Sequence, residues 1–136
     1  MVRRIEHIAI AVRDVDASAR LFAVLLGLTP GHIETLPDER VKVAFFELGG
    51  SRLELVQGIG SDNPMTKFIE RRGEGLHHLC LEVEDLPKTL TFLEAAGFPL
   101  IDSVPKPGSR GTQVAFVHPN GCNGVLIELV EQPSRA

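Results

Sequence analysis

Apolar side chains occur along the chain in short runs that predict alternating strands and a helix. The segment IAIAV at 8–12 is short and rich in branched side chains, which is typical of a strand. Asp14 is expected to cap a helix that ends at Gly27. The apolar stripe of that helix consists of Val15, Phe22, Leu25 and Leu26. Further strands are expected at 31–36, 41–48 and 51–57.

The same order of elements is predicted again in the second half. Asp85 is expected to cap a helix with the stripe Leu86, Leu90 and Leu93, and Gly97 ends it. Strands are expected near 99–104, 112–117 and 124–131. Between the halves, Asn63 and Pro64 begin a short helix that Gly73 closes.

An internal repeat explains this recurrence. IEHIAIAVRDVDASARLF at 5–22 aligns with LHHLCLEVEDLPKTLTFL at 76–93. Farther along, VAF at 43–45 matches VAF at 114–116, and RLELV at 52–56 matches LIELV at 126–130. The sequence therefore predicts an α+β fold of two tandem βαβββ modules. Within one domain we expect the first module at about 1–60, a linking helix at about 61–73 and the second module at about 74–136.

The repeat distinguishes the two histidines of GEGLHHLC (73–80). His78 aligns with His7, whereas His77 aligns with Glu6. Neighbouring residues in a strand point to opposite faces, so at most one histidine of the pair can enter a given site. We expect His78 to enter it and His77 to be structural.

Two glutamates recur in the same way. Glu54 and Glu128 each stand in mid-strand among apolar residues, where an uncompensated carboxylate is costly. If the modules pack about a pseudo-twofold axis, these carboxylates can converge with His7 and His78. Two imidazoles and two carboxylates suit a divalent first-row metal that keeps open positions for a ligand. Other residues are expected to be structural (His118), on the surface (His32) or a small apolar core residue (Cys80).

Composition narrows the classes of function. The 136 residues carry a net charge of −4 and include neither Trp nor Tyr, which gives no support to nucleic-acid binding. The two cysteines have no CxxC spacing, which favours a reducing compartment. Because the N-terminal apolar run is short, we expect no signal peptide, no membrane span and a cytoplasmic location.

These features together resemble the vicinal oxygen chelate superfamily and, within it, the methylmalonyl-CoA epimerase family. The resemblance covers nearly the whole chain, and its most discriminating stretches are GEGLHH and HP followed by a loop and GVLIEL. It implies a curved, mixed-sheet half-barrel and a homodimer. It also implies metal ligands at His7, Glu54, His78 and Glu128, with Co²⁺ best in vitro and Mn²⁺, Ni²⁺, Zn²⁺ or Mg²⁺ as other candidates.

The implied reaction interconverts (2R)- and (2S)-methylmalonyl-CoA, a step of propionate metabolism. It removes the C2 proton and passes through a metal-stabilised enolate, and inversion needs a proton donor and an acceptor on opposite faces. We expect Glu128 to be one base. Some relatives carry a glutamate where Val43 stands here, so Glu54 or a water is the candidate for the second.

An acyl-CoA substrate also needs cations for its phosphates. Lys106 and Arg110 lie in the glycine- and proline-rich loop PKPGSRG (105–111) and are the first candidates. A second candidate cluster on the linking helix consists of Lys67, Arg71 and Arg72. The family usually has a lysine after the HP pair, where this chain has Asn120.

Two alternatives share the fold. A glyoxalase I-like lactoylglutathione lyase would use the same four ligands, but GEGLHH and HPNGCNGVLIEL favour the epimerase. A non-catalytic small-molecule-binding protein would not need metal ligands in both modules.

Overall fold

The chain folds into two compact units whose boundary cuts through two strands. The computed structural model describes residues 1–29 and 32–134. The first unit is Ile8–His77, and the second unit combines Met1–His7 with His78–Ala136. Strand β1 (Val2–Ala11) contributes to both units, as does β5 (Gly75–Val83). That the whole chain is one domain stays a prediction.

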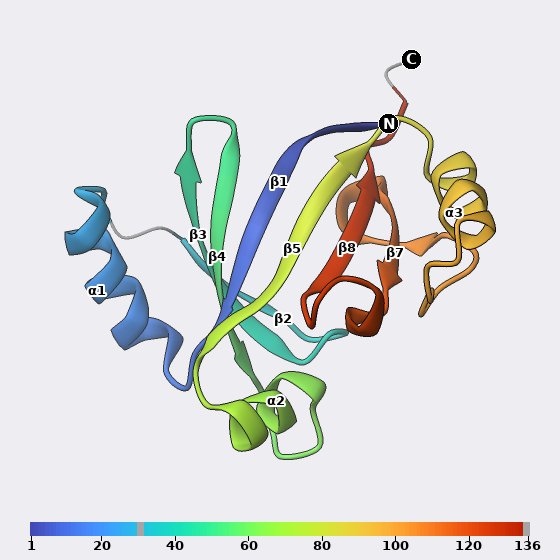
Figure 1. Ribbon diagram of the computed structural model, residues 1–136. Coiled ribbons are helices and arrows are strands. Elements are labelled where there is room, and N and C mark those ends of the chain that lie inside the picture. Colours follow the sequence, from blue (N-terminus) through green and yellow to red (C-terminus); the bar gives the residue numbers. More distant parts are fainter. Residues whose placement is uncertain (30–31, 135–136) are drawn as a thin grey trace. The chain divides into compact units, whose positions relative to one another are not determined.

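The first unit holds two helices and an antiparallel arrangement of strands. Its strand order is β2-β3-β4-β1. Pairing of β2 with β3 and of β3 with β4 is antiparallel, with Val43 opposite Val56 and Phe45 opposite Glu54. Besides the end of β1 and the start of β5, its elements are α1 (Val15–Leu26), β2 (Ile33–Leu36), β3 (Val41–Leu48), β4 (Ser51–Gly58) and α2 (Pro64–Arg72) (Figure 1).

Helix α1 begins and ends as predicted, and its buried stripe departs from the prediction at Leu25. The Asp14 carboxylate accepts a hydrogen bond from the Ala17 amide at 3.1 Å, and Gly27 ends the helix in the left-handed conformation at φ 68°. Leu25 is 71% exposed, so its assignment to the buried stripe was wrong. The small residues Ala19 and Ala23 face the sheet instead, which lets the helix approach closely.

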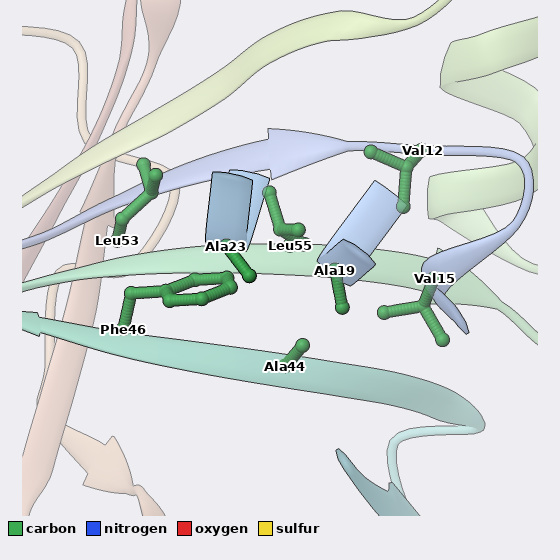
Figure 2. Packing of buried hydrophobic residues seen from close by; sticks show 8 residues of the cluster. All are labelled: Val12, Val15, Ala19, Ala23, Ala44, Phe46, Leu53 and Leu55. Atoms are coloured by element: carbon green, nitrogen blue, oxygen red, sulfur yellow. The ribbon is translucent and has the colours of Figure 1, made fainter. Parts of the chain in front are cut away.

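Both faces of the first unit's sheet are covered. One face packs against α1. The buried cluster between them, shown in Figure 2, consists of Val12, Val15, Ala19, Ala23, Ala44, Phe46, Leu53 and Leu55. The other face carries Ala9, Ala11, Val41, Val43 and Val56, against which Met65 and Ile69 of α2 pack. Asn63 begins α2 by accepting from the Met65 amide at 2.8 Å and donating to the Arg40 carbonyl at 2.8 Å.

The second unit repeats the order strand, helix and three strands. Its strand order is β1-β5-β8-β7-β6. β5 and β8 are parallel whereas β8 and β7 are antiparallel, so the sheet is mixed as predicted. Besides β1 and β5, its elements are α3 (Leu86–Ala95), β6 (Lys106–Pro107), β7 (Gln113–Val117) and β8 (Leu126–Glu131) (Figure 1).

The strand predicted near 99–104 is wrong. This segment forms only an isolated bridge between Leu100 and Val117, and the regular strand β6 is two residues long at Lys106–Pro107. Pro99 removes a backbone donor at the start of the segment, and the amides of Ile101 and Asp102 both donate to the Phe116 carbonyl. The Asp102 side chain instead accepts from the Phe116 amide at 2.8 Å.

Helix α3 covers one face of the second unit's sheet. Asp85 caps it, with its carboxylate accepting from the Lys88 amide at 3.0 Å, and Leu86 and Leu90 are buried as predicted. They pack with Val83, Ala115, Val117 and Leu129. The opposite face, which we call the site face, carries the buried cluster of Cys80, Val114 and Val130.

The predicted α+β fold with two βαβββ modules is confirmed. The order β1-α1-β2-β3-β4 returns as β5-α3-β6-β7-β8, and α2 lies between them. Residue 31, the predicted start of the third expected element, lies outside the described residues. Within the part of the chain that the structure describes, no helix combines the length and apolar character needed to cross a membrane.

Leu55 tests the packing of the first unit. Its side chain is fully buried, so Leu55→Ala is expected to lower the free energy of unfolding by about 2–5 kcal/mol in a urea titration. Leu25→Ala, at an exposed position of α1, is the matched control and should change stability by no more than about 0.5 kcal/mol. Equal losses in both variants would contradict the assigned faces of α1 and β4.

Candidate metal centre

Three of the four predicted ligands meet on the site face of the second unit. His7 Nε2 lies 3.1 Å from His78 Nε2 and 3.4 Å from a carboxylate oxygen of Glu128. The same oxygen lies 3.1 Å from His78 Nε2. These three donor atoms come from three different strands and form a compact triangle.

Strand order and register bring these side chains together. β5 lies between β1 and β8, so residues from all three strands can meet across β5. In the parallel pair β5–β8, Cys80 is opposite Glu128 and His78 is opposite Leu126. Because residues two apart share a face, His78 points to the same side as the buried Cys80, and Glu128 to the same side as Val130.

Burial makes the site electrostatically demanding. The side chains of His7, His78 and Glu128 are only 10%, 12% and 14% exposed. Burial by itself raises the pKa of the Glu128 carboxyl, but hydrogen bonds and charge interactions with His7 and His78 outweigh it and lower this pKa to about 2. Glu128 is therefore an anionic carboxylate at neutral pH, the form that binds a cation.

The second ring nitrogen of His7 contacts Glu6. The Glu6 carboxylate is hydrogen-bonded to His7 Nδ1, and both residues are buried. The sequence does not predict this contact, because alternation in an ideal strand points neighbouring side chains apart. The available signal was a carboxylate directly before a ligand histidine.

Cys80 is an apolar neighbour of the triangle, as predicted. It is fully buried with Val114 and Val130. Burial raises the pKa of its thiol to about 12, against a weaker opposing effect of a hydrogen bond with His7. At neutral pH the side chain is a protonated thiol.

Glu54, the fourth predicted ligand, belongs to the first unit. It lies in mid-strand on β4, and its side chain is 12% exposed. A carboxylate oxygen is 3.7 Å from the Arg52 guanidinium, which also lies 4.8 Å from the centre of the Phe45 ring. The strand places Glu54 on the face of Val56, against which α2 packs. Its membership of the ligand set stays a prediction.

The other histidines make contacts outside the triangle of donor atoms. His77 makes an edge contact with the Phe68 ring of α2, with centroids 4.8 Å apart. His118 Nδ1 accepts from the Asn120 amide at 3.0 Å at the start of a short 3₁₀ turn (Pro119–Gly121). His32 is exposed, as expected.

The candidate cations for phosphate binding lie in both units. In the second unit, Lys106 Nζ is 3.5 Å from Asp102 and 5.1 Å from the centre of the Phe116 ring. Phe116 in turn makes an edge contact with His78, at 6.2 Å between centroids. Arg110 is exposed at a left-handed backbone position with φ 56°. Lys106 therefore stands one aromatic ring away from the triangle.

The cluster on α2 belongs to the first unit. Lys67 Nζ is 3.2 Å from Asp62, and the Arg72 guanidinium lies 5.7 Å from the centre of the Phe68 ring. Arg71 is exposed. Each of the three cations reaches solvent at least in part.

Val43 occupies the position at which some relatives carry a glutamate that could act as the second base. It is buried in the apolar cluster beneath α2, and Val56 is its partner across the ladder. Glu47, farther along β3, is exposed and opposite Arg52. Position 43 therefore supplies no carboxylate for proton transfer.

The donor set of the triangle fits a divalent metal ion. Two ligands that lie about 2.1 Å from one ion at right angles are about 3 Å apart, close to the separations of 3.1–3.4 Å found here. Two imidazole nitrogens and one carboxylate oxygen suit first-row ions such as Co²⁺, Mn²⁺, Ni²⁺ or Zn²⁺, whereas an all-oxygen site is typical of Mg²⁺ or Ca²⁺.

Comparison with known proteins places the chain in a family. Residues 6–116 match the family model described as Glyoxalase/Bleomycin resistance protein/Dioxygenase superfamily. An ethylmalonyl-CoA/methylmalonyl-CoA epimerase of Cereibacter sphaeroides is 38% identical over 95% of this chain and 98% of that protein. A mitochondrial methylmalonyl-CoA epimerase of Mus musculus is 34% identical over 93% of this chain and 71% of that protein.

A solved structure agrees with these relatives. A methylmalonyl-CoA epimerase in complex with methylmalonyl-CoA and NH4+ superimposes with a TM-score of 0.87 and 29% sequence identity, covering 98% of this chain and 97% of that one. The predicted vicinal oxygen chelate fold is thereby confirmed. The chain belongs to the methylmalonyl-CoA epimerase family within the Glyoxalase/Bleomycin resistance protein/Dioxygenase superfamily.

Proposed function

We propose that this protein is a metal-dependent epimerase that interconverts (2R)- and (2S)-methylmalonyl-CoA. The observation that carries the proposal is the triangle of His7 Nε2, His78 Nε2 and a Glu128 oxygen, whose edges are 3.1–3.4 Å. Relatives named as epimerases of this substrate, at 34% and 38% identity over most of the chain, support it.

The three residues would hold a divalent ion, of which Co²⁺ is the first candidate. When bound, such an ion supplies Lewis-acid stabilisation of the negative charge that develops on the thioester oxygen as the C2 proton leaves. The protein's own part is to keep Glu128 ionised and both imidazoles oriented within a largely buried site. Because these groups are in place before the substrate arrives, little reorganisation accompanies the reaction.

We assign Glu54 as the fourth ligand and, with Glu128, as a candidate for proton transfer at C2. Epimerisation needs groups on both faces of the carbon, and a positioned carboxylate is a suitable acid or base. The internal repeat, which matches Glu54 with Glu128, supports this assignment. A water remains the alternative second base.

We further propose that Lys106 and Arg110 contact the phosphates of the acyl-CoA. Lys106 lies above Phe116, next to His78, so a ligand near the triangle would pass this loop. The cluster of Lys67, Arg71 and Arg72 is the second candidate. A homodimer, a cytoplasmic location and a role in propionate metabolism complete the proposal, the location being supported by two cysteines that form no disulfide.

Proton exchange tests the activity directly. In deuterated water, the Co²⁺-loaded protein should incorporate deuterium at C2 of methylmalonyl-CoA, as followed by NMR or mass spectrometry, and a chelator should abolish incorporation. Absence of metal-dependent exchange would reject the epimerase. If Co²⁺ binds without such exchange, a lactoylglutathione lyase assay decides the alternative enzyme, and failure of both assays favours a non-catalytic binding protein.

The two adjacent histidines provide a matched pair of variants. His78→Ala should weaken Co²⁺ binding by at least about 100-fold, because it removes one donor from the triangle. His77→Ala should retain Co²⁺ with an affinity like that of the wild type, since His77 contributes no donor to the triangle and makes an edge contact with Phe68. Titration with a competing chelator measures both affinities. Similar losses in the two variants would show that His77 also reaches the ion.

The glutamates can be separated by amide variants. Glu128→Gln should lower Co²⁺ affinity strongly, because it removes the anion of the triangle. Glu54→Gln should keep most of that affinity, because its amide oxygen can still bind the ion. It should slow C2 exchange by about 100-fold or more, because an amide cannot transfer the proton. Exchange at the wild-type rate in Glu54→Gln would remove Glu54 from the catalytic role.

A further inference from the structure

We propose that Glu6 is a positioning residue that fixes the proton of His7 on Nδ1 and so presents Nε2 to the metal. The inference rests on the proposed metal-dependent function. It begins from three contacts of one imidazole. The Glu6 carboxylate meets Nδ1, whereas Nε2 faces His78 at 3.1 Å and Glu128 at 3.4 Å.

The chemistry of the ring explains why this matters. A neutral imidazole carries one N–H, and a metal binds only the nitrogen that lacks it. An ionised carboxylate only accepts hydrogen bonds, so Glu6 favours the tautomer with the proton on Nδ1. When a metal ion occupies the triangle and binds Glu128, the lone pair of Nε2 points to that ion. Without Glu6, the ring is free to place its proton on Nε2, where it blocks the metal.

Burial strengthens this effect. Glu6 is 8% exposed and His7 is likewise 8% exposed, so water competes little for the hydrogen bond between them. The hydrogen bond from Nδ1 to Glu6 also restrains rotation of the His7 ring. Glu6 therefore acts on the metal through His7.

The contact between a glutamate and a ligand histidine is present in the first module of the repeat and has no counterpart at the aligned position of the second. The repeat aligns Glu6 with His77, which carries no carboxylate and contacts Phe68 in the first unit. His78 consequently receives no acidic neighbour from the corresponding position. We infer that the two ligand histidines are tuned differently although the repeat makes them equivalent.

One competing arrangement must be distinguished. Donor atoms of Glu6, His7 and Cys80 also lie within 4.8 Å of one another, so Glu6 could itself be a ligand together with the Cys80 sulfur. In that arrangement His7 would use Nδ1, and Glu128 and His78 would be dispensable. Absorption spectroscopy separates the two, because Co²⁺ bound to sulfur gives a charge-transfer band in the near ultraviolet that nitrogen and oxygen ligands lack.

The test compares the full-length protein with Glu6→Ala, Glu6→Gln and the control Glu84→Ala. Glu84 is an exposed carboxylate of the same unit that pairs with Arg3 at 3.6 Å, so its variant removes the same charge without touching His7. Chelator competition should show Co²⁺ affinity about 10–100-fold weaker in Glu6→Ala. Glu6→Gln, whose amide oxygen can still accept from Nδ1, should recover most of it, and Glu84→Ala should match the wild type.

A second readout needs no activity. In the wild type loaded with Zn²⁺, ¹⁵N NMR of the imidazole rings should show His7 protonated at Nδ1 with Nε2 bound to the ion, and Glu6→Ala should retain less of this form. If Glu6→Ala does not fold, the same spectrum of wild type and Glu6→Gln decides. A wild-type His7 protonated at Nε2 would overturn the proposal.

The outcomes separate this inference from the function. If the wild type shows Co²⁺-dependent exchange at C2 but Glu6→Ala binds Co²⁺ equally well, the inference fails and the function stands. If Glu6→Ala loses affinity but no variant catalyses exchange, the positioning role stands and the epimerase fails. A sulfur charge-transfer band that disappears in Cys80→Ala would overturn the inference in favour of the competing arrangement.

Discussion

The proposed site depends on the pairing of β5 with β8. This parallel register places Glu128 beside Cys80 and directs its carboxylate to the site face, while β1 on the other side of β5 supplies His7. A slip of one residue would turn Glu128 towards α3 and bring Ile127 or Leu129 into its place. The apolar contacts of α3 with Val83, Ala115 and Leu129 oppose such a slip, so the packing of one face holds the chemistry of the other.

Burial of charge sets the second constraint. Burial raises the pKa of the Glu128 carboxyl, and its interactions with two imidazoles outweigh this effect, so that it is ionised at neutral pH. Glu82, on the same face of β5, is compensated by Arg4 at 3.2 Å. Among the described residues, every buried side-chain nitrogen or oxygen has a hydrogen-bond partner. Polar groups on the site face are thus each matched to a partner, as a pre-organised site requires.

The features that could be predicted from the sequence are those that recur in both modules of the repeat. Similar apolar neighbours surround His7 and His78, so this pair and the strands and caps around it could be predicted. Glu128 could be predicted through its match with Glu54. Leu25 was placed in the stripe of α1 by hydrophobicity, but alanines pack closer to the sheet there. The strand near 99–104 failed because the Asp102 side chain, in place of a backbone carbonyl, accepts from the Phe116 amide. The contact between Glu6 and His7 depends on the local course of β1, which periodicity does not describe.

The most direct measurement is anomalous diffraction at the cobalt absorption edge from crystals grown with Co²⁺. The account predicts one strong peak within about 2.3 Å of His7 Nε2, His78 Nε2 and a Glu128 oxygen. A peak bound instead by Glu6 and Cys80, or no peak between these three side chains in a crystal that contains cobalt, would contradict it.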